Sequence, residues 1–279
     1  MILINIVILS GKGGTGKTLV STNLASYMKA NYIDADVEEP NGFIFLNPKI
    51  EKQNDVLVDI PYINEEKCQR CYKCVDFCAF NVFSIAKDKI SIFDKMCHSC
   101  GGCKIICPFG AIDYQNKKLG VIEEGYANDL YCKRGVLKIS EPISVPIIKQ
   151  LLENLKDGIN IIDSSPGTSC NVVNTLAFAD KAILVTEPTE FGLHDLKRAI
   201  KIVVDLNIPF GIIINRVTNE DNLVKNYCEK NNYLILGTIK YDKKIAELYS
   251  EGKLLLEEKE YIFTFDKISQ KIKEELLWK

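Results

Sequence analysis

The sequence predicts an α/β fold in which a mostly parallel sheet is covered by helices on both faces, with a small α+β insert. Three observations predict it. Short apolar runs alternate with helical stretches along most of the chain, as in parallel sheets. A glycine-rich loop follows the first apolar run. Between residues 59 and 118 the alternation gives way to cysteine-rich, short-looped sequence.

The elements follow in order along the chain. The apolar run Ile2–Leu9 predicts a buried strand, and Lys17–Lys29 carries apolar residues at helical spacing. Tyr32–Ile33 is a short strand that ends in Asp34-Ala-Asp36. The later strand candidates are Leu119–Ile122, Val136–Ile139, Ile159–Ile162, Ala182–Thr186, Phe210–Ile214 and Tyr233–Leu236. The later helix candidates are Pro146–Leu155, Asp195–Leu206 and Asp221–Asn231.

Composition excludes some classes of function. The 279 residues include 35 basic and 37 acidic side chains, and no basic run is longer than a pair, so we expect no nucleic-acid partner. No apolar run is long enough to span a bilayer. The segment Met1–Leu9 lacks the basic n-region and the cleavage site of a signal peptide, so a buried strand and a cytoplasmic location are expected.

The glycine-rich loop matches the pattern G-x-x-x-x-G-K-[ST] between a predicted strand and a predicted helix. In this context backbone N–H groups converge on phosphate oxygens at the start of the helix. Lys17 is expected to reach the β- and γ-phosphates of ATP, and Thr18 is expected to bind Mg²⁺. A chance glycine-rich turn is the alternative. The predicted nucleotide-binding residues of the loop are Gly11, Lys12, Gly13, Gly14, Thr15, Gly16, Lys17 and Thr18.

Eight of the 11 cysteines form two runs with the spacing of bacterial two-cluster ferredoxins. In that pattern the fourth cysteine of each run ligates the other cluster. One predicted [4Fe–4S] site therefore takes Cys68, Cys71, Cys74 and Cys107, and the other takes Cys78, Cys97, Cys100 and Cys103. Zinc is the alternative, since C-x-x-C pairs also build zinc sites.

The two cysteine runs differ after their fourth cysteine, since Cys107 is followed by Pro108 and Cys78 by Ala79. Proline at this position shapes the chain beyond the ligand but donates nothing to iron, so we expect ligation to be unaffected by its absence after Cys78. His98, inside the second run, is expected to be a surface residue near the cluster.

The run Gly-Lys-Gly-Gly-Thr-Gly-Lys-Thr resembles the deviant P-loop of the MinD/ParA superfamily, which includes the nitrogenase iron protein and Mrp-type cluster carriers. The resemblance implies that Lys12 contacts the nucleotide of a partner subunit in a face-to-face dimer. A solvated loop lysine is the alternative. Asp34-Ala-Asp36 resembles switch I, whose second acid orients the attacking water, and Asp163-Ser-Ser-Pro-Gly167 resembles switch II.

The same resemblance assigns further roles. Asp163 would lie near Mg²⁺, so that Thr18, Asp36 and Asp163 form the magnesium set and Lys12, Lys17, Asp36 and Asp163 the catalytic set. Asn215-Arg216 resembles the adenine-recognition position. The ATPase domain would comprise residues 1–58 and 119–279, interrupted by a ferredoxin domain at 59–118. Such ferredoxin-containing ATPases are found mostly in anaerobes.

Three cysteines lie outside the runs. Cys228 is expected in the core, and a packed, neutral Cys170 is expected. Cys170 follows Asp163 by seven residues, as a cluster ligand does in the nitrogenase iron protein, so a bridging site between subunits, with Cys132, is the alternative. The stripe Phe265, Ile268, Ile272, Leu276 and Leu277 lacks a strongly basic opposite face, which favours a packed closing helix over a membrane anchor.

The resemblance implies an ATPase in which nucleotide-driven dimerisation gates electron transfer through two clusters to an acceptor protein. The dimer would pair the chain with itself or with a paralogous subunit. The alternative is an assembly factor that passes an Fe–S or other metallocluster to apo-metalloproteins.

Overall fold

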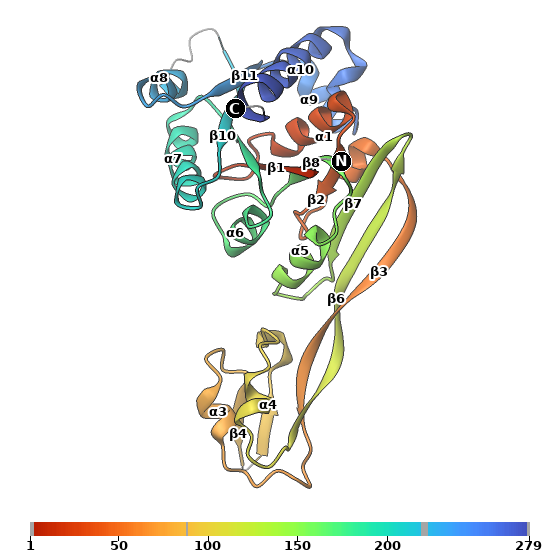
Figure 1. Ribbon diagram of the computed structural model, residues 1–279, viewed down its shortest axis with the longest axis vertical. Coiled ribbons are helices and arrows are strands. Elements are labelled where there is room, and N and C mark those ends of the chain that lie inside the picture. The colour runs from red at the N-terminus through yellow and green to blue at the C-terminus, as the bar shows by residue number, and fades with distance from the viewer. Residues whose placement is uncertain (1–2, 88, 219–222, 278–279) are drawn as a thin grey trace.

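A nine-stranded sheet organises the chain (Figure 1). The computed structural model describes residues 3–87, 89–218 and 223–277. The strand order is β11-β10-β9-β1-β8-β2-β7-β6-β3, in which the pairs from β11 to β7 are parallel and the last two pairs are antiparallel. The nine strands are β1 Leu3–Leu9, β2 Asn31–Asp34, β3 Lys49–Ile63, β6 Ile112–Ala127, β7 Leu130–Leu137, β8 Gly158–Asp163, β9 Lys181–Thr186, β10 Phe210–Val217 and β11 Ile235–Lys240.

Helices cover both faces of the sheet because the central strands are apolar on both sides. Val7 and Leu9 pack in one core cluster, while Ile6 and Ile8 pack in the other, as the two-residue period of a strand requires. The helices of the first face are α5 Val145–Leu152, α6 Cys170–Leu176, α7 Glu190–Asp205 and α8 Leu223–Lys230. The helices of the second face are α1 Lys17–Met28, α2 Gly42–Leu46, α9 Lys243–Ser250 and α10 Lys259–Lys271, with the 3₁₀ turn η2 Leu255–Glu257 and the π-helix η3 Ile272–Leu277.

The predicted α/β architecture is confirmed, with shifts at several boundaries. The strand expected at Tyr233–Leu236 instead begins at Ile235 and runs to Lys240. The short strands expected at Leu119–Ile122 and Val136–Ile139 belong to the much longer β6 and to β7, which ends at Leu137. Of the predicted elements, Ile2 and the residues Asp221 and Asn222 lie outside the described part of the chain.

A long two-stranded ribbon leads from the sheet to the cysteine-rich unit (Figure 1). Strands β3 and β6 pair from Lys49 opposite Tyr126 to Ile63 opposite Ile112, with register shifts between Ile50 and Lys52 and between Val56 and Leu57. The cysteine-rich unit between them consists of α3 Lys73–Phe77, β4 Phe83–Ala86, β5 Lys89–Ile92, the 3₁₀ turn η1 Asp94–Met96 and α4 Gly102–Ile106. Residues 58/59 and 118/119, the predicted boundaries, lie inside the two ribbon strands.

The cysteine-rich unit has its own small core, made of Cys74, Val82, Phe83, Cys103 and Ile112. At the other end of the chain, the predicted apolar stripe of the closing helix is buried against the sheet, with Phe265 and Ile272 fully inaccessible to solvent. Among the described residues, no helix combines the length and apolar character needed to cross a bilayer.

Candidate nucleotide and cluster sites

The glycine-rich loop lies between β1 and α1, as the sequence predicts. Gly16 is the residue that fixes its path, since its φ of 91° is in the left-handed region. A Cβ atom there would lie 2.2 Å from the Asn215 side-chain nitrogen, so only glycine fits. Gly13 and Gly14 are exposed and face open space, which leaves room for a ligand over the loop.

Lys17 lies at the centre of a buried charged cluster. Its Nζ atom is 2.6 Å from Asp163 Oδ1 and 4.0 Å from Asp36 Oδ2, and its side chain is only 7% exposed. The parallel strands β8 and β2 end side by side, which brings Asp163 opposite Asp34 and places the segment after β2 next to both. Burial is the main cause that raises the pKa of Asp36, to about 6, and Asp163 adds to it while Lys17 opposes it.

Asp34, the first acid of the predicted switch I, is an anchor for the backbone. Its carboxylate accepts hydrogen bonds from the backbone N–H groups of Gly42 and Asp36, at 2.9 and 3.2 Å. Tyr32, which the sequence analysis missed, places its hydroxyl 3.2 Å from both Asp34 Oδ2 and Asp163 Oδ2. Burial, together with the charge of Asp163, raises the pKa of Asp34.

One oxygen in the loop has no partner. Thr15 Oγ1 is buried and accepts or donates no hydrogen bond to the described residues. A buried, unpaired hydroxyl costs about 1–3 kcal/mol, so its presence in a phosphate-binding motif fits a site that is completed by a polar ligand.

Lys12 and Arg216 share one carboxylate. Lys12 Nζ lies 3.3 Å from Glu187 Oε2, and the Arg216 guanidinium donates to Glu187 Oε1. Glu187 follows directly after β9 and is itself buried. No motif indicates this role of Glu187. Its position does, since ligands of such sheets bind beyond the carboxyl ends of the parallel strands.

Asn215 and Arg216 line a pocket of about 740 Å³ beside the glycine-rich loop. Asn215 also donates a hydrogen bond of 2.8 Å to the carbonyl oxygen of Thr15, so it holds the loop itself. The remaining wall comes from elements that the sequence analysis did not single out, namely Lys240, Tyr241, Asp242, Ile245, Ala246 and Tyr249.

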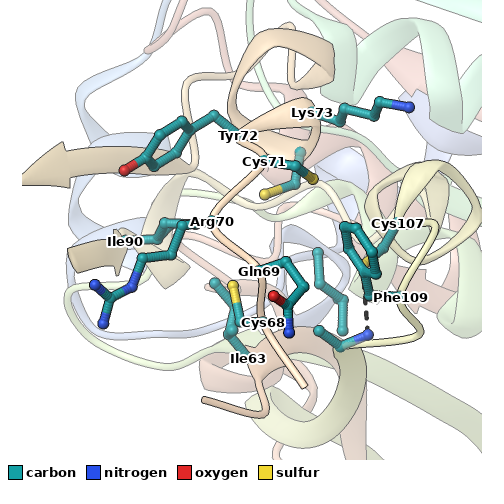
Figure 2. A pocket seen from close by; sticks show the side chains of 13 residues that line it. Ile63, Cys68, Gln69, Arg70, Cys71, Tyr72, Lys73, Ile90, Cys107 and Phe109 are labelled. Atoms are coloured by element: carbon teal, nitrogen blue, oxygen red, sulfur yellow. Dashed lines mark hydrogen bonds between the residues drawn. The ribbon is translucent and has the colours of Figure 1, made fainter. Parts of the chain in front are cut away.

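The eight clustered cysteines fall into two pockets. One pocket, of about 330 Å³, is lined by Cys68, Cys71, Cys74 and Cys107, and Figure 2 shows Cys68, Cys71 and Cys107 around it with Phe109. The other, of about 680 Å³, is lined by Cys78, Cys97, Cys100 and Cys103. Each pocket thus combines three cysteines of one run with the fourth cysteine of the other run.

The two cysteine runs have the same backbone path. Left-handed φ angles occur at Arg70 and Ser99, at Tyr72 and Gly101, and at Asn81 and Gly110, which are equivalent positions in the two runs. The runs continue through α3 and α4, and Cys78 and Cys107 are the C-cap residues of these two helices. For Arg70 and Tyr72 this conformation costs roughly 1–2 kcal/mol each, so the surroundings hold the turns against their preference.

The thiols of these pockets are not ordinary surface cysteines. Burial raises the pKa of Cys74, and the charges of Cys68 and Cys107 raise it further. Backbone N–H groups of Ser99 and Ala111 donate to the sulfur atoms of Cys97 and Cys107, at 3.4 and 3.3 Å. Within the described ranges, no group of three or more His, Cys, Asp or Glu side chains is arranged to hold a single metal ion.

The other predicted site residues have clear positions. His98 is exposed and stacks on Phe80 with ring centroids 3.8 Å apart, as expected for a surface residue beside the second pocket. Cys228 is buried, as predicted. The expectation of a packed Cys170 is wrong, because this residue opens α6 and is exposed. Cys132 is fully buried within the sheet, so it cannot reach a site shared between subunits.

The loop, the strand order and the buried lysine–aspartate cluster define a P-loop nucleotide-binding protein of the α/β class. The family model described as the CobQ/CobB/MinD/ParA nucleotide binding domain matches residues 6–256, so the chain belongs to this family of P-loop ATPases.

Two relatives and one solved structure show what the chain is similar to. The chain is similar to an uncharacterized protein of Methanocaldococcus jannaschii, MJ0579, with 35% identity over 261 residues that cover 90% of this chain and 91% of the relative. An iron-sulfur cluster carrier protein of the same organism is 28% identical over 239 residues, which cover 81% of this chain and 62% of the carrier. The solved structure of the septum site-determining protein MinD with Mg-ADP from Pyrococcus horikoshii has a TM-score of 0.61 at 18% identity and covers 99% of this chain and 98% of that one.

Proposed function

We propose that this protein is an ATPase whose nucleotide state gates electron transfer to an acceptor protein through two [4Fe–4S] clusters. The observation that carries the proposal is the sorting of eight cysteines into two pockets of four. The proposed ligands are Cys68, Cys71, Cys74 and Cys107 for one cluster and Cys78, Cys97, Cys100 and Cys103 for the other. When bound, such clusters exchange single electrons at potentials tuned by hydrogen bonds to sulfur.

The chemistry of the donors fits iron–sulfur clusters. Soft thiolates select such clusters over hard cations, and iron keeps thiolates deprotonated despite burial. The N–H groups of Ser99 and Ala111 that point at sulfur are the kind of contact that tunes cluster potentials. The left-handed turns at Arg70 and Tyr72 are the kind of backbone strain that concentrates at functional sites.

The roles proposed for the nucleotide site follow from its geometry. Lys17 would leave Asp163 for the β- and γ-phosphates of ATP, and Thr15 Oγ1 would gain its missing partner. Thr18, Asp36 and Asp163 would hold Mg²⁺, which shields the phosphate charges, and Asp36 would orient the attacking water. The pocket behind Asn215 and Arg216 has the position of an adenine site next to the loop.

Lys12 is proposed to act across a dimer interface. In the structure it is paired with Glu187, and its side chain is 35% exposed, so it can leave this partner at small cost. The partner subunit would be a second copy or a paralogue. We further propose that residues 1–58 and 119–279 form the ATPase domain and that residues 59–118 form the ferredoxin domain. The ferredoxin domain would then include the parts of ribbon strands β3 and β6 next to the cysteine-rich unit.

The test is electron delivery by the anaerobically purified protein. Dithionite-reduced protein is mixed with benzyl viologen, and cluster oxidation is followed by absorbance with and without Mg-ATP. We expect the rate to depend on ATP in the native protein and in a control Lys201→Met, exposed on α7. Lys17→Met should keep both clusters and lose the dependence. A native rate that is independent of ATP would refute gating.

A second candidate function is assembly and transfer of a metallocluster. Two observations favour it: the similarity to an iron-sulfur cluster carrier protein, and the exposed Cys170 at the start of α6. In this version a labile cluster would bridge the two copies of Cys170 in a dimer. Cys170→Ser would then abolish cluster transfer to an apo-ferredoxin, whereas gated electron transfer leaves this variant fully active.

A further inference from the structure

A continuous series of polar contacts links the nucleotide site to the second cysteine pocket. It starts at Glu38, in the segment that begins with the predicted switch I at Asp34 and runs to residue 41; this whole segment is called switch I below. The Ser144 hydroxyl lies 3.0 Å from Glu38 Oε1 and 3.0 Å from Asn171 Oδ1, and Asn171 Nδ2 donates to Glu38 Oε1 at 3.0 Å. Asn171 is on α6, just after switch II (residues 163–167). Ser144 therefore contacts switch I itself and the helix that follows switch II.

Ser144 is an unusual helix cap. It is buried and occupies the N-cap position of α5, where a serine side chain ordinarily accepts a hydrogen bond from the first turn. Here its side chain makes no such bond and is directed to Glu38 and Asn171 instead. Pro146 has no N–H to offer, and the Ile147 N–H donates to the Ser144 carbonyl at 3.0 Å, so the first turn does not need the Ser144 hydroxyl.

The loop of residues 138–144 connects Ser144, its last residue, to the next contact in the series. Its start is tied to switch I as well, because the Leu137 N–H donates to the Val37 carbonyl at 2.8 Å. The next N–H, of Lys138, donates to the carbonyl of Leu119 on ribbon strand β6, at 2.8 Å. The loop is therefore fixed between the switch and the root of the ribbon.

Lys117 joins this loop to the cysteine-rich unit. Its Nζ atom lies 2.7 Å from Glu141 Oε2 in the loop and 3.1 Å from Asp94 Oδ2 in η1. The side chains of Lys117 and Glu141 are 18% and 7% exposed, so this ion pair is better shielded than a surface pair. The hydrogen bond from Lys117 holds the pKa of Asp94 below its usual range.

Asp94 ends the series at a proposed cluster ligand. Its carbonyl oxygen accepts a hydrogen bond of 3.1 Å from the N–H of Cys97, which lines the second pocket. No equivalent contact between the first pocket and the switch segments is found among the described residues. The link is thus specific to the pocket of Cys78, Cys97, Cys100 and Cys103.

We infer that the Glu141–Lys117–Asp94 bridge is a positioning device that transmits the state of the switches to the cluster loop at Cys97. The inference rests on the proposed function, in which ATP binding at Asp36 moves switch I. A shift of Glu38 alters the Ser144 end of the loop, Glu141 moves with it, and Lys117 carries the change to Asp94. The first pocket has no such bridge among the described residues, so its cluster is expected to respond less to ATP.

Hydrogen exchange of the full-length, cluster-loaded protein tests this bridge, with a non-hydrolysable ATP analogue and Mg²⁺ added or omitted. In the native chain we expect the analogue to change exchange in residues 138–144 and in 94–101. Lys117→Met should keep the first response and lose the second. Lys118→Met is the matched control, since Lys118 pairs with Asp55 on the ribbon and with neither Glu141 nor Asp94.

A second variant tests the bridge in case Lys117→Met does not fold. Asp94→Ala removes the other end of the bridge at a side chain that is 51% exposed, and it leaves the pair of Lys117 with Glu141 intact. It should lose the response of 94–101 like Lys117→Met. An unchanged response in these variants, or no response of 94–101 in the native chain, overturns the inference. A redox titration of the same samples reports separately on the proposed function, which fails if the analogue leaves both cluster potentials unchanged.

Discussion

The ammonium group of Lys17 lies 2.6 Å from Asp163 Oδ1, so the residue expected to hold phosphate is engaged by the aspartate of switch II. Both side chains are almost inaccessible to solvent. A phosphate that takes Lys17 leaves Asp163 without its partner, and a bound Mg²⁺ would compensate that charge. Under the proposed function, the pair would couple occupancy of the glycine-rich loop to the position of the predicted switch II.

Replacement of Lys17 should affect stability as well as binding. Lys17→Met leaves Asp163 buried and unpaired, which costs about 3 kcal/mol in the free energy of unfolding, and it should abolish ATP binding. Urea unfolding and calorimetric titration with ATP measure the two effects. Lys12→Met, in the same loop but partly exposed, should change stability by less than about 1 kcal/mol. Equal stability of the two variants would contradict the role assigned to the buried pair.

Two glycines of the loop should respond differently to alanine. Gly16→Ala places a Cβ atom against the Asn215 side chain at a left-handed φ, and we expect a loss of about 1–2 kcal/mol or more in unfolding free energy. Gly13→Ala meets no atom within 4 Å and should fold like the native chain. Because the open space over Gly13 is the proposed phosphate site, that variant should bind ATP more weakly. Thermal unfolding without nucleotide separates the two, and a native melting temperature for Gly16→Ala would be inconsistent with this geometry.

Glu187 should restrain the proposed dimer. Glu187→Gln releases Lys12, and we expect ATP-dependent dimerisation at roughly two- to fivefold lower protein concentration, the equivalent of about 0.5–1 kcal/mol for a partly exposed ion pair. Sedimentation at saturating ATP analogue measures this without interference from nucleotide affinity. Lys12→Met should remain monomeric. Weaker dimerisation of Glu187→Gln would argue against a resting contact between Glu187 and Lys12.

Each pocket takes its fourth cysteine from the other run, an arrangement called crossed ligation here. It predicts a different result from one in which each run holds its own cluster. Cys107→Ser lies in the second run but should remove the cluster held by Cys68, Cys71 and Cys74, halving an iron content of about eight per chain. Iron and sulfide analysis with EPR of the remaining cluster provides the measurement. Cys170→Ser, exposed and outside both pockets, should leave the iron content unchanged. Full iron in Cys107→Ser would rule out the crossed ligation.

The sequence predicted correctly those parts of the fold that a single short motif identifies. The loop at Gly11–Thr18 and the cysteine runs have fixed spacing, and the structure places them between the expected elements and in the expected pockets. Strand β3 was missed because its first half, Lys49–Asp55, is exposed on both faces and shows no apolar alternation. Its pairing partner, β6, lies about 60 residues away, and only the tertiary structure brings them together.

The contacts that sequence analysis missed in the site all depend on where strands end. Tyr32, Glu187 and Ser144 are unremarkable in the sequence, and each gains its role from a residue more than 25 positions away. The error at β11 has a similar cause. The apolar run Tyr233–Leu236 is only partly in the strand, which continues as an edge strand through Thr238 and Lys240, where one side faces solvent.

The most direct test of gated electron transfer is an EPR-monitored redox titration of the anaerobically purified protein with and without Mg-ATP. We predict two [4Fe–4S] signals that interact magnetically and a shift of at least one midpoint potential when Mg-ATP is present. Potentials that do not change with nucleotide, together with an additional cluster whose signal comes and goes with ATP, would contradict gated electron transfer and favour cluster assembly.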